Sequence, residues 1–425
     1  MSRLESMLKT RLRRKSQTCK VYKVKIDNSH LSKKSLAHID RLFLEAKWFY
    51  NYCLSHENIN DSDTTVKSVP VKVIDKFEDR KFTVLMSHMK QGIKKRIFTS
   101  LKALSTKKKN GYKVGRLKFK SRFNSISLSE YQADFDIYFD KNRMRLSGLE
   151  QKLRVKGLRQ IPQQAEIANA ILVRKADGLY FHVTTFVKKQ ERNVPDKSIG
   201  IDFGCQTQLT LSNGIKIEFQ VPISNRLRRL DRKINKRVDI NYNKRPDSKN
   251  KQKDLAKRRK EYQKLANKKK DIKNKVVNTI TTCFKYVCFQ DESIHAWQTN
   301  NHGKKIQNSG IGGIIVDLKH KSHTPLEVDK FFSSTQLCPR CKGKKKLDQS
   351  IRIYECKCGY QEDRDIHAAK NIEQEGMNQV PTDCRDIKPE EILPSTFFDL
   401  LCNIHGIKVS KVKLLSQEAP RFIVG

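Results

Sequence analysis

Apolar and polar residues follow two different periods in the first half of the chain. Residues 19–26 alternate between the two kinds, as a half-buried strand does. Residues 35–56 and 82–104 have apolar side chains at helical spacing and predict two amphipathic helices, the second with a basic outer face. The predicted buried face of the first helix consists of Leu36, Ile39, Leu42, Phe43, Ala46 and Phe49. Further short strands are predicted at residues 137–139, 168–173 and 180–187.

These elements predict a β-rich module over residues 18–194, with a helical insertion at about residues 30–105. Within it, residues 111–120 predict a hairpin rich in Lys and Arg. Residues 1–17 precede the module and are expected to form a mobile basic segment.

The composition changes near Pro195, and the second half predicts a different element order. Three closely spaced strands are followed by a long basic helical region that is broken around Pro246. A strand that ends at Glu292, a helix and a last strand come next. The predicted elements lie at residues 198–202, 207–211, 216–219, 227–282, 284–292, 306–318 and 327–332. The order β-β-β-α-β-α-β fits an RNase H-like α/β core, and residues 376–425 are expected to be irregular and partly disordered.

The charge balance indicates a polyanionic partner. The 425 residues include 88 Lys and Arg but only 45 Asp and Glu, which gives a formal net charge of +43. Basic residues gather in three separate stretches, at residues 9–15, 106–122 and 225–275. Such a distribution favours a long nucleic-acid path over a short localisation signal, the alternative being a set of solvated helix faces.

Other features narrow the class of protein. No apolar run is long enough to span a bilayer, and the N-terminal residues lack a signal-peptide core. Eleven cysteines, an odd number, argue against a disulfide scaffold and for a reducing compartment, so we expect a cytoplasmic, nucleic-acid-associated protein. A Walker-type phosphate loop is absent from the sequence, which gives no support to an NTPase.

Four cysteines near the C-terminal end form the sharpest local motif. They are arranged as Cys338-Pro-Arg-Cys341 and Cys356-Lys-Cys358. Four thiolates satisfy a closed tetrahedral Zn²⁺ site, and the polar loop between the pairs needs such a metal to fold. The second pair is Cys-x-Cys instead of Cys-x-x-Cys, so the spacing favours Cys358 over Cys356 as a ligand. The remaining cysteines are scattered and are interpreted as structural: Cys19, Cys53, Cys205, Cys283, Cys288, Cys384 and Cys402.

Three acidic residues lie far apart along the chain in comparable settings. Asp202 ends an apolar run, Glu292 follows a predicted strand, and Asp365 begins a predicted helix. Two-metal nucleases of the RNase H-like type assemble carboxylates from distant segments in this way, to hold two divalent ions about 4 Å apart.

Each of these acids also has an ordinary structural interpretation. Asp202 at a strand end is able to cap a turn, and Asp365 is able to serve as a helix N-cap. Asp291 is an alternative to its neighbour Glu292. Asp363 and Glu362 lie close to Asp365; we expect the strand or helical offset to put them on different faces, so that only one points inward.

Several segments together resemble the TnpB family of transposon-encoded, RNA-guided DNA nucleases, which are similar to compact type V CRISPR effectors. The segments that carry the resemblance to the RuvC motifs and the zinc finger begin at Ser198, Phe289, Cys338 and Cys358, and read SIGIDFG, FQDESIHAW, CPRC and CGYQEDRDIHAAKNI. In the first half, FLEAKWFYN from Phe43, GRLKFKS from Gly115 and KADGLYFHVT from Lys175 are similar to the same family. The resemblance covers roughly residues 18–375.

The resemblance implies a multidomain α+β architecture. A wedge-like β-barrel with a helical recognition insertion (residues 18–194) would precede an RNase H-like RuvC nuclease domain (195–335). A zinc finger (336–360) would follow, then the last RuvC motif (361–375) and the irregular tail (376–425).

By match to the family motifs, the catalytic acids are Asp202, Glu292 and Asp365, which would hold two Mg²⁺ ions beside the structural Zn²⁺. The family commonly has Asn two residues after the third acid, where this chain has His367, so hydrogen bonding there is expected to differ.

The implied function is an RNA-guided DNA endonuclease with a guide RNA and a target DNA as partners. Base pairing would supply the target sequence, and the protein would read a short flanking DNA motif and the shape of the heteroduplex. Two alternatives stay open: a guide-directed repressor that has lost cleavage, and a guide-free RNase H-like nuclease or transposase. The intact acids weigh against the first, and the large basic first half weighs against the second.

Overall fold

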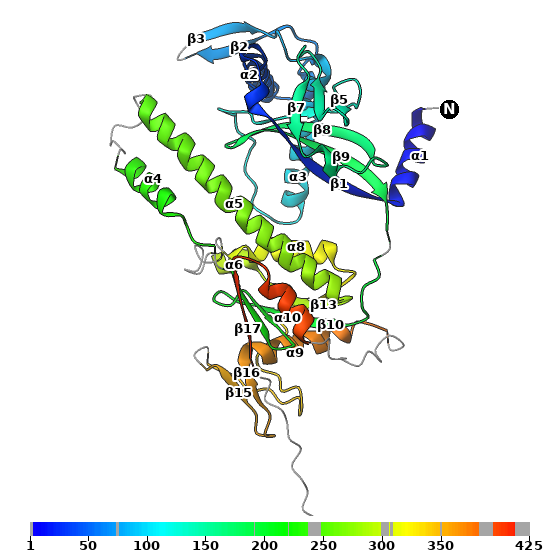
Figure 1. Ribbon diagram of the computed structural model, residues 1–425, viewed down its shortest axis with the longest axis vertical. Helices are drawn as coiled ribbons and strands as arrows, with labels where there is room; N and C mark the ends of the chain where they lie inside the picture. Colours follow the sequence, from blue (N-terminus) through cyan, green and yellow to red (C-terminus); the bar gives the residue numbers. More distant parts are fainter. Residues whose placement is uncertain are drawn as a thin grey trace, which may run out of the picture. The chain divides into compact units, whose positions relative to one another are not determined.

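The computed structural model describes residues 3–73, 76–190, 192–219, 221–236, 248–298, 306, 309–348, 351–381 and 394–412. The chain divides into two compact units, Met1–Glu191 and Arg192–Gly425, drawn in Figure 1. Each unit has a hydrophobic core of its own. None of the helices in the described ranges is long and apolar enough to cross a membrane.

The first unit is built on a seven-stranded antiparallel sheet that curls into a nearly closed barrel, which confirms the predicted barrel with attached helices (Figure 1). Its order is β4-β8-β9-β1-β7-β6-β5. The strands are β1 (Gln17–Ile26), β4 (Ser125–Leu128), β5 (Phe135–Tyr138), β6 (Arg143–Leu146), β7 (Leu153–Lys156), β8 (Glu166–Lys175) and β9 (Gly178–Lys188). Strand β1 pairs with β9 along nine residues and then with β7 at Lys25 and Ile26, so one long strand joins both parts of the sheet.

Two helices and a hairpin are inserted between β1 and β4. They are α2 (Lys33–Ser55), the hairpin β2 (Ser68–Val73) and β3 (Lys76–Lys81), and α3 (Ser87–Lys109). Apolar side chains of α2 and α3 complete the barrel core, among them Leu42, Phe49 and Met89. Leu36, however, is 45% exposed, so its assignment to the buried face was wrong.

Helix α3 begins later than the predicted residue 82, because the preceding backbone binds a buried carboxylate. Glu45 of α2 is fully buried, and its two oxygens accept hydrogen bonds from the backbone N–H groups of Thr83 (2.9 Å), Val84 (3.0 Å) and Leu85 (2.8 Å). Those N–H groups hold the segment extended until Ser87 starts the helix.

Two predictions for the first unit are wrong. The basic segment at residues 1–17 contains the helix α1 (Arg3–Lys15), and Arg13 binds Glu166 of β8 at 2.8 Å. Residues 111–120 form no hairpin. There the side-chain amide of Asn51 forms the two hydrogen bonds that a neighbouring strand would otherwise form with Lys120. It donates to the carbonyl of Lys120 (3.1 Å) and accepts from its N–H (2.8 Å).

The second unit contains a six-stranded mixed sheet with the order β14-β13-β10-β11-β12-β17. Its strands are β10 (Ser198–Phe203), β11 (Leu209–Leu211), β12 (Ile215–Phe219), β13 (Tyr286–Gln290), β14 (Thr324–Val328) and β17 (Ile407–Lys411). Strand β13 is parallel to both β10 and β14, and the other pairs are antiparallel. Strand β14, which corresponds to the last predicted strand, begins at Thr324, three residues before the predicted start at residue 327.

The helices of the second unit are α4 (Asn225–Asn235), α5 (Lys249–Cys283), α6 (Ile294–Trp297), α8 (Ile311–Lys321), α9 (Arg364–Met377) and α10 (Pro394–Cys402). The C-terminal half of α5 packs its apolar face, with Ile272, Val276 and Ile280, into the core. A small two-stranded sheet of β15 (Ile353–Glu355) and β16 (Gln361–Asp363) lies between β14 and α9.

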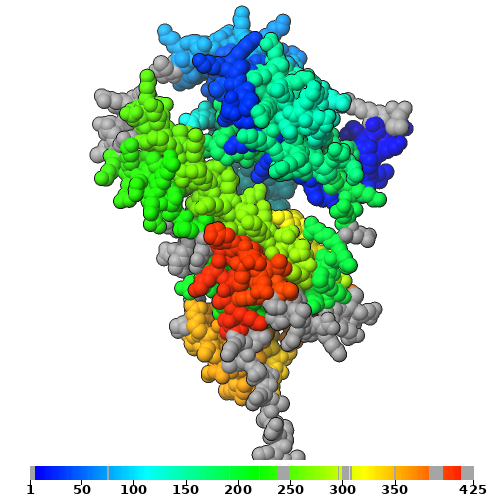
Figure 2. All heavy atoms as spheres, viewed as in Figure 1, coloured from blue at the N-terminus to red at the C-terminus, as the bar shows by residue number. Residues whose placement is uncertain are grey.

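Part of the segment expected to be an irregular tail is ordered. Strand β17 pairs with β12 from Ile215 to Phe219 and extends the sheet at that edge. Helix α10, red in Figure 2, packs beside α5, where the rings of Phe284 and Phe397 meet edge to face at 5.1 Å. The rest of the predicted tail, residues 382–393 and 413–425, lies outside the described residues.

Helix α9 approaches the sheet unusually closely at two glycines. A Cβ atom at Gly200 of β10 would lie 2.0 Å from the carbonyl oxygen of Ala369, and one at Gly376 of α9 would lie 2.7 Å from the Sγ atom of Cys288 on β13. Only glycine permits these contacts. They bring the start of α9 to the ends of β10 and β13.

We predict that Gly200→Ala destabilises the second unit by about 1–3 kcal/mol or more, because the atom in the way belongs to the backbone and has no rotamer to escape into. Gly312→Ala in α8 is the matched control: its new methyl group would meet Ile294 at an ordinary 3.6 Å. Thermal and denaturant unfolding measure both variants. Equal stability of Gly200→Ala and the wild-type protein would contradict the close approach.

Candidate functional site

The three predicted acids lie near the carboxyl ends of two neighbouring strands in the second unit's sheet. Asp202 is near the end of β10, Glu292 is two residues beyond the end of β13, and Asp365 is in the first turn of α9. Strands β10 and β13 are parallel neighbours, with Ile201 opposite Phe289, so their carboxyl ends meet. The close packing of α9 on β10 adds the third carboxylate.

Electrostatics show that these carboxylates act on one another. Burial raises the pKa of Asp202 to about 8, and the negative charges of Asp365 and Glu292 contribute to the rise. The positive charges of Arg364 and Lys216 oppose it only in part. Burial also raises the pKa of Glu292. Like charges gathered in a half-buried place favour a bound cation, and carboxylate oxygens are the ligands that Mg²⁺ prefers.

The alternative acid next to Glu292 has a different environment. Asp291 is exposed and forms an ion pair with Lys319 of α8 at 3.1 Å, while Lys319 also binds Glu327 at 2.6 Å. Glu292 is half-buried, and within the described residues its carboxylate has no ion-pair partner. Of the two neighbours, Glu292 is the one whose negative charge contributes to the raised pKa of Asp202.

The helix cap is Asp363 and not Asp365. The Asp363 carboxylate accepts hydrogen bonds from the backbone N–H groups of Asp365 (3.1 Å) and Ile366 (3.2 Å), as an N-cap does. The N-cap interpretation of Asp365 was wrong, and its side chain remains available to the acidic cluster. Nor does Asp202 accept a hydrogen bond that would cap a turn in the part of the chain that is described.

A lysine that the sequence analysis missed lies beside the acids. The Nζ atom of Lys216, on β12, is 2.8 Å from Asp363 and 3.6 Å from Asp365, and its side chain is only 15% exposed. Both aspartates thus contact the same ammonium group, but Asp363 uses its carboxylate to cap α9, whereas the charge of Asp365 contributes to the raised pKa of Asp202. In the sequence, Lys216 stands at a polar position of a strand and looks like many other lysines of this basic chain.

The predicted four-cysteine cluster is confirmed. The Sγ atoms of Cys338 and Cys358 are 3.6 Å apart, those of Cys341 and Cys356 are 3.5 Å apart, and all four lie within 4.8 Å of one another. A tetrahedral zinc ion with Zn–S bonds of about 2.3 Å has sulfur–sulfur edges of about 3.8 Å, so the donor set and spacing fit a structural zinc ion. Among the described residues, no other set of three or more Cys, His, Asp or Glu side chains is this tight.

Cys356 joins the cluster on equal terms, although its Cys-x-Cys spacing made it the less expected ligand. Gly359, with a left-handed φ of +84°, turns the chain so that its N–H donates to the carbonyl of Cys356 at 3.0 Å. A hydrogen bond from the backbone N–H of Cys358 lowers the pKa of Cys356 to about 6, which favours the thiolate form that binds metal. The other described cysteines form no disulfide, and Cys384 lies outside the described residues.

Basic surfaces occur on both units. On α5, five exposed lysines recur every three or four residues along one face and extend over about 22 Å of helix. They are Lys253, Lys257, Lys260, Lys264 and Lys268. On the first unit, residues 111–122, here called the basic strap, expose Tyr112 (67%) and Phe119 (65%) among lysine and arginine side chains. Exposed aromatic rings between cations are typical of surfaces on which unpaired bases stack.

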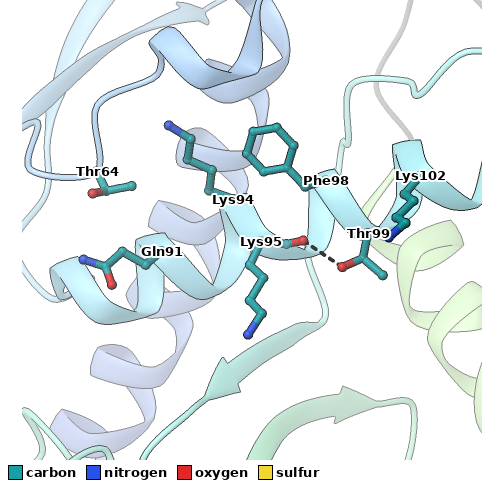
Figure 3. Close-up of a pocket in the computed structure, with 7 residues that line it drawn as sticks. All are labelled: Thr64, Gln91, Lys94, Lys95, Phe98, Thr99 and Lys102. Carbon is teal, nitrogen blue, oxygen red and sulfur yellow. Dashed lines mark hydrogen bonds between the residues drawn. The ribbon is translucent and has the colours of Figure 1, made fainter. Parts of the chain in front are cut away.

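A groove of about 370 Å³ lies along α3 of the first unit (Figure 3). Lys94 is anchored there, because its Nζ atom donates to the carbonyls of Asn60 (2.9 Å) and Ser62 (2.6 Å). Lys95, Phe98 and Lys102 are exposed along the same stretch of α3 and line the groove. Apolar walls with cationic side chains at the rim suit a base and its phosphate better than an uncharged ligand.

Comparisons with known proteins point to one family. Residues 318–372 match the model of the Cas12f1-like TNB domain, a stretch that includes the four cysteines and Asp365. A curated protein of Streptomyces pristinaespiralis named "Putative RNA-guided DNA endonuclease" is 24% identical over 271 residues, which cover 61% of this chain and 65% of that protein. A solved structure, "Cryo-EM structure of the Cas12f1-sgRNA-target DNA complex", aligns with 84% of this chain and 99% of its own at 12% identity and a TM-score of 0.44.

The family match and the curated relative confirm the resemblance to TnpB proteins and compact type V effectors that the motifs predict. The match to the family model is confined to the segment from the end of α8 to α9, and the chain spans less than two thirds of the curated relative.

We predict that Cys338→Ser, Cys341→Ser and Cys358→Ser each reduce bound zinc to near zero and lower the thermal stability of the second unit, because three ligands leave a structural site open. Cys402→Ser, an exposed thiol outside the cluster, is the control. Elemental analysis of the purified variants gives the zinc content. Full stoichiometry in all three cluster variants would rule out this metal site.

We predict that Asp202→Asn stabilises the metal-free protein above pH 4. The folded pKa of about 8 exceeds the ordinary value of 3.8, so folding takes up a proton and stability falls as pH rises from about 4 to 8. An asparagine does not titrate, and the difference between variant and wild type should grow over that range and then level off.

Thermal unfolding between pH 5 and 9, with and without Mg²⁺, measures this effect. Mg²⁺ should stabilise the wild-type protein more than the variant, since only the wild type offers the carboxylate. Asp291→Asn is the control. Parallel pH profiles for Asp202→Asn and the wild type would contradict the raised pKa of Asp202 in the folded protein.

Proposed function

We propose that this protein is an RNA-guided DNA endonuclease whose catalytic acids are Asp202, Glu292 and Asp365. The observation that carries the proposal is the position of Asp202, Glu292 and Asp365 at the ends of β10 and β13 and the start of α9, where burial, together with the charges of Asp365 and Glu292, raises the pKa of Asp202. A cluster with this much uncompensated negative charge is expected to bind divalent cations.

The sheet of the second unit supports an RNase H-like interpretation. Three consecutive antiparallel strands are followed, after helices, by two strands parallel to the first one, in the order β14-β13-β10-β11-β12. This arrangement agrees with the β-β-β-α-β-α-β order of the sequence. Asp202 and Glu292 lie at the carboxyl ends of parallel strands, where α/β sheets generally carry their ligands.

In this proposal each acid contributes oxygen ligands for two Mg²⁺ ions. Bound divalent ions would lower the pKa of a coordinated water and neutralise charge on the scissile phosphate. Lys216 and Asp363 hold the first turn of α9 in place, so that Asp365 faces Asp202. Arg364, which lies 3.7 Å from Asp365, adds positive charge at the rim of the site.

The nucleic-acid partners follow from charge and from the relative. A protein with a net charge of +43, an exposed lysine row on α5 and aromatic side chains in the basic strap is suited to a long polyanion with unpaired bases. The curated relative is named as RNA-guided, and we infer the same dependence here. A guide RNA would supply the sequence, and the protein a reading of a short flanking DNA motif.

Expression with the native flanking DNA, recovery of the bound RNA and cleavage of a matched DNA with Mg²⁺ test the proposal. We expect one abundant structured RNA. Asp202→Ala, Glu292→Ala and Asp365→Ala should each reduce cleavage by at least about 10³-fold, the order of loss when a group that acts only in the transition state is removed, with RNA and target binding nearly intact.

Asp291→Ala is the matched control, because its carboxylate pairs with Lys319 at the surface. Asp363→Ala is not a neutral control, since it removes the cap of α9. Binding of the target without cutting by the wild-type protein would favour a guide-directed repressor. Full cutting by RNA-free protein would favour a guide-free nuclease, and full cutting by Asp202→Ala would remove the nuclease proposal.

A further inference from the structure

Helix α9 is held between two different surfaces. One face packs on β10 and β13 through Ala369, Ile372 and Gly376. The other face carries His367, Lys370 and Asn371, which lie three and four residues apart and meet the residues around the cysteine cluster. The acids belong to the first surface and the thiolates to the second, so α9 is the element that both share.

Asn371 fixes the chain that leads into the cluster. It is 1% exposed, and its Nδ2 atom donates to the carbonyl oxygens of Ser334 and Leu337, both at 2.7 Å. Leu337 directly precedes Cys338. Both hydrogens of the amide are thereby used, which determines the orientation of the side chain.

His367 packs against β15, the strand that directly precedes Cys356. Its fully buried ring stacks on that of Tyr354 of β15, with centroids 3.9 Å apart and an interplanar angle of 13°. Tyr354 is also fully buried and lies in the core that contains Cys338 and Tyr360. In the same region Glu362, which accepts a hydrogen bond from Tyr360, binds Lys370 at 2.5 Å.

The ring of His367 contributes contact area more than hydrogen bonds. Its Nδ1 atom is buried without a hydrogen-bond partner, and its Nε2 atom faces an Asn371 amide whose hydrogens are already donated elsewhere. Burial lowers the pKa of His367 to about 4, so the ring is neutral near pH 7. This is the position at which the resembled family commonly has Asn, a side chain that cannot stack in this way.

We propose that the Tyr354–His367 stack and the Asn371 clamp form a positioning device that attaches the first turn of α9, and with it Asp365, to the thiolate cluster. Because His367 is in the same helical turn as Asp365, ordering the cysteine module also orders the carboxylate. His367 is a positioning residue and touches neither the substrate nor the reacting atoms.

The inference concerns the site of the proposed function, but it can be tested without cleavage. In full-length protein loaded with zinc, Mn²⁺ serves as a probe of the acid cluster and is titrated by electron paramagnetic resonance. We expect His367→Ala to keep its zinc yet bind Mn²⁺ roughly 10- to 100-fold more weakly, the range found when side chains that orient metal ligands are removed. His367→Phe keeps a flat ring for the stack and should bind Mn²⁺ within about twofold of the wild type, by the same measure.

Gln374→Ala is the matched control on α9, since it removes only an exposed contact with Lys342 of the cysteine module. DNA cleavage by His367→Ala should recover as Mg²⁺ is raised, as expected for a weakened metal site. Unchanged Mn²⁺ affinity in His367→Ala, or equal losses in the Ala and Phe variants, would overturn the inference.

Should His367→Ala lose its zinc, zinc-stripped wild-type protein gives the deciding measurement. Hydrogen exchange of the amides of residues 366–369 should then accelerate and Mn²⁺ affinity fall, whereas no change in either would overturn the inference. Wild-type protein that binds Mn²⁺ but cuts no DNA would sink the proposed function, and the Mn²⁺ comparison between the variants would still decide the positioning role.

Discussion

The second unit depends on one close contact, the approach of helix α9 to strand β10 at Gly200. A single methyl group at this position would lie 2.0 Å from a backbone oxygen of the helix. The helix begins at Arg364 and the strand ends at Phe203, so the contact brings residues more than 150 positions apart into one small region. The convergence of Asp202 and Asp365 follows from it, since neither side chain is long enough to bridge a wider gap.

The contact creates an electrostatic cost as well as a site. Three carboxylates in a half-buried place repel one another, and this repulsion adds to the effect of burial in raising the pKa of Asp202. Lys216 and Arg364 offset part of it, and divalent cations would offset the rest. A scaffold that holds such charges together must be rigid on every side, which the sheet supplies on one face of α9 and the cysteine module on the other.

The cysteine module itself is too small to fold on apolar contacts alone. Its core consists of Cys338, Tyr354 and Tyr360, and a metal held by the four thiolates would supply folding energy that these few side chains cannot. The module presents the flat ring of Tyr354 to His367. One helix, α9, thus connects the acid cluster to the cysteine cluster, and in the proposed function the basic surfaces on α5 and on the first unit would supply the affinity for nucleic acid.

The sequence by itself determined the features that depend on local pattern. Period-two and helical spacing predicted most strands and helices, and the pairing of four cysteines identified their cluster, because thiolates at short spacing have few other uses. The acids were predicted from their positions after two strands and at a helix start, and from the resemblance. Only the tertiary structure decided which neighbour plays which part. Asp363 caps α9 because the helix begins at the next residue, Arg364. Asp291 forms a surface ion pair with Lys319. Lys216, on a strand far away in the sequence, contacts both Asp363 and Asp365. Strand β17 pairs with β12, which lies nearly 200 residues earlier in the chain. Asn51 binds the backbone of Lys120, 69 residues later, where a hairpin was predicted. Such contacts leave little trace in a single sequence, since the partner that satisfies a backbone or a charge is chosen by packing and not by its neighbours along the chain.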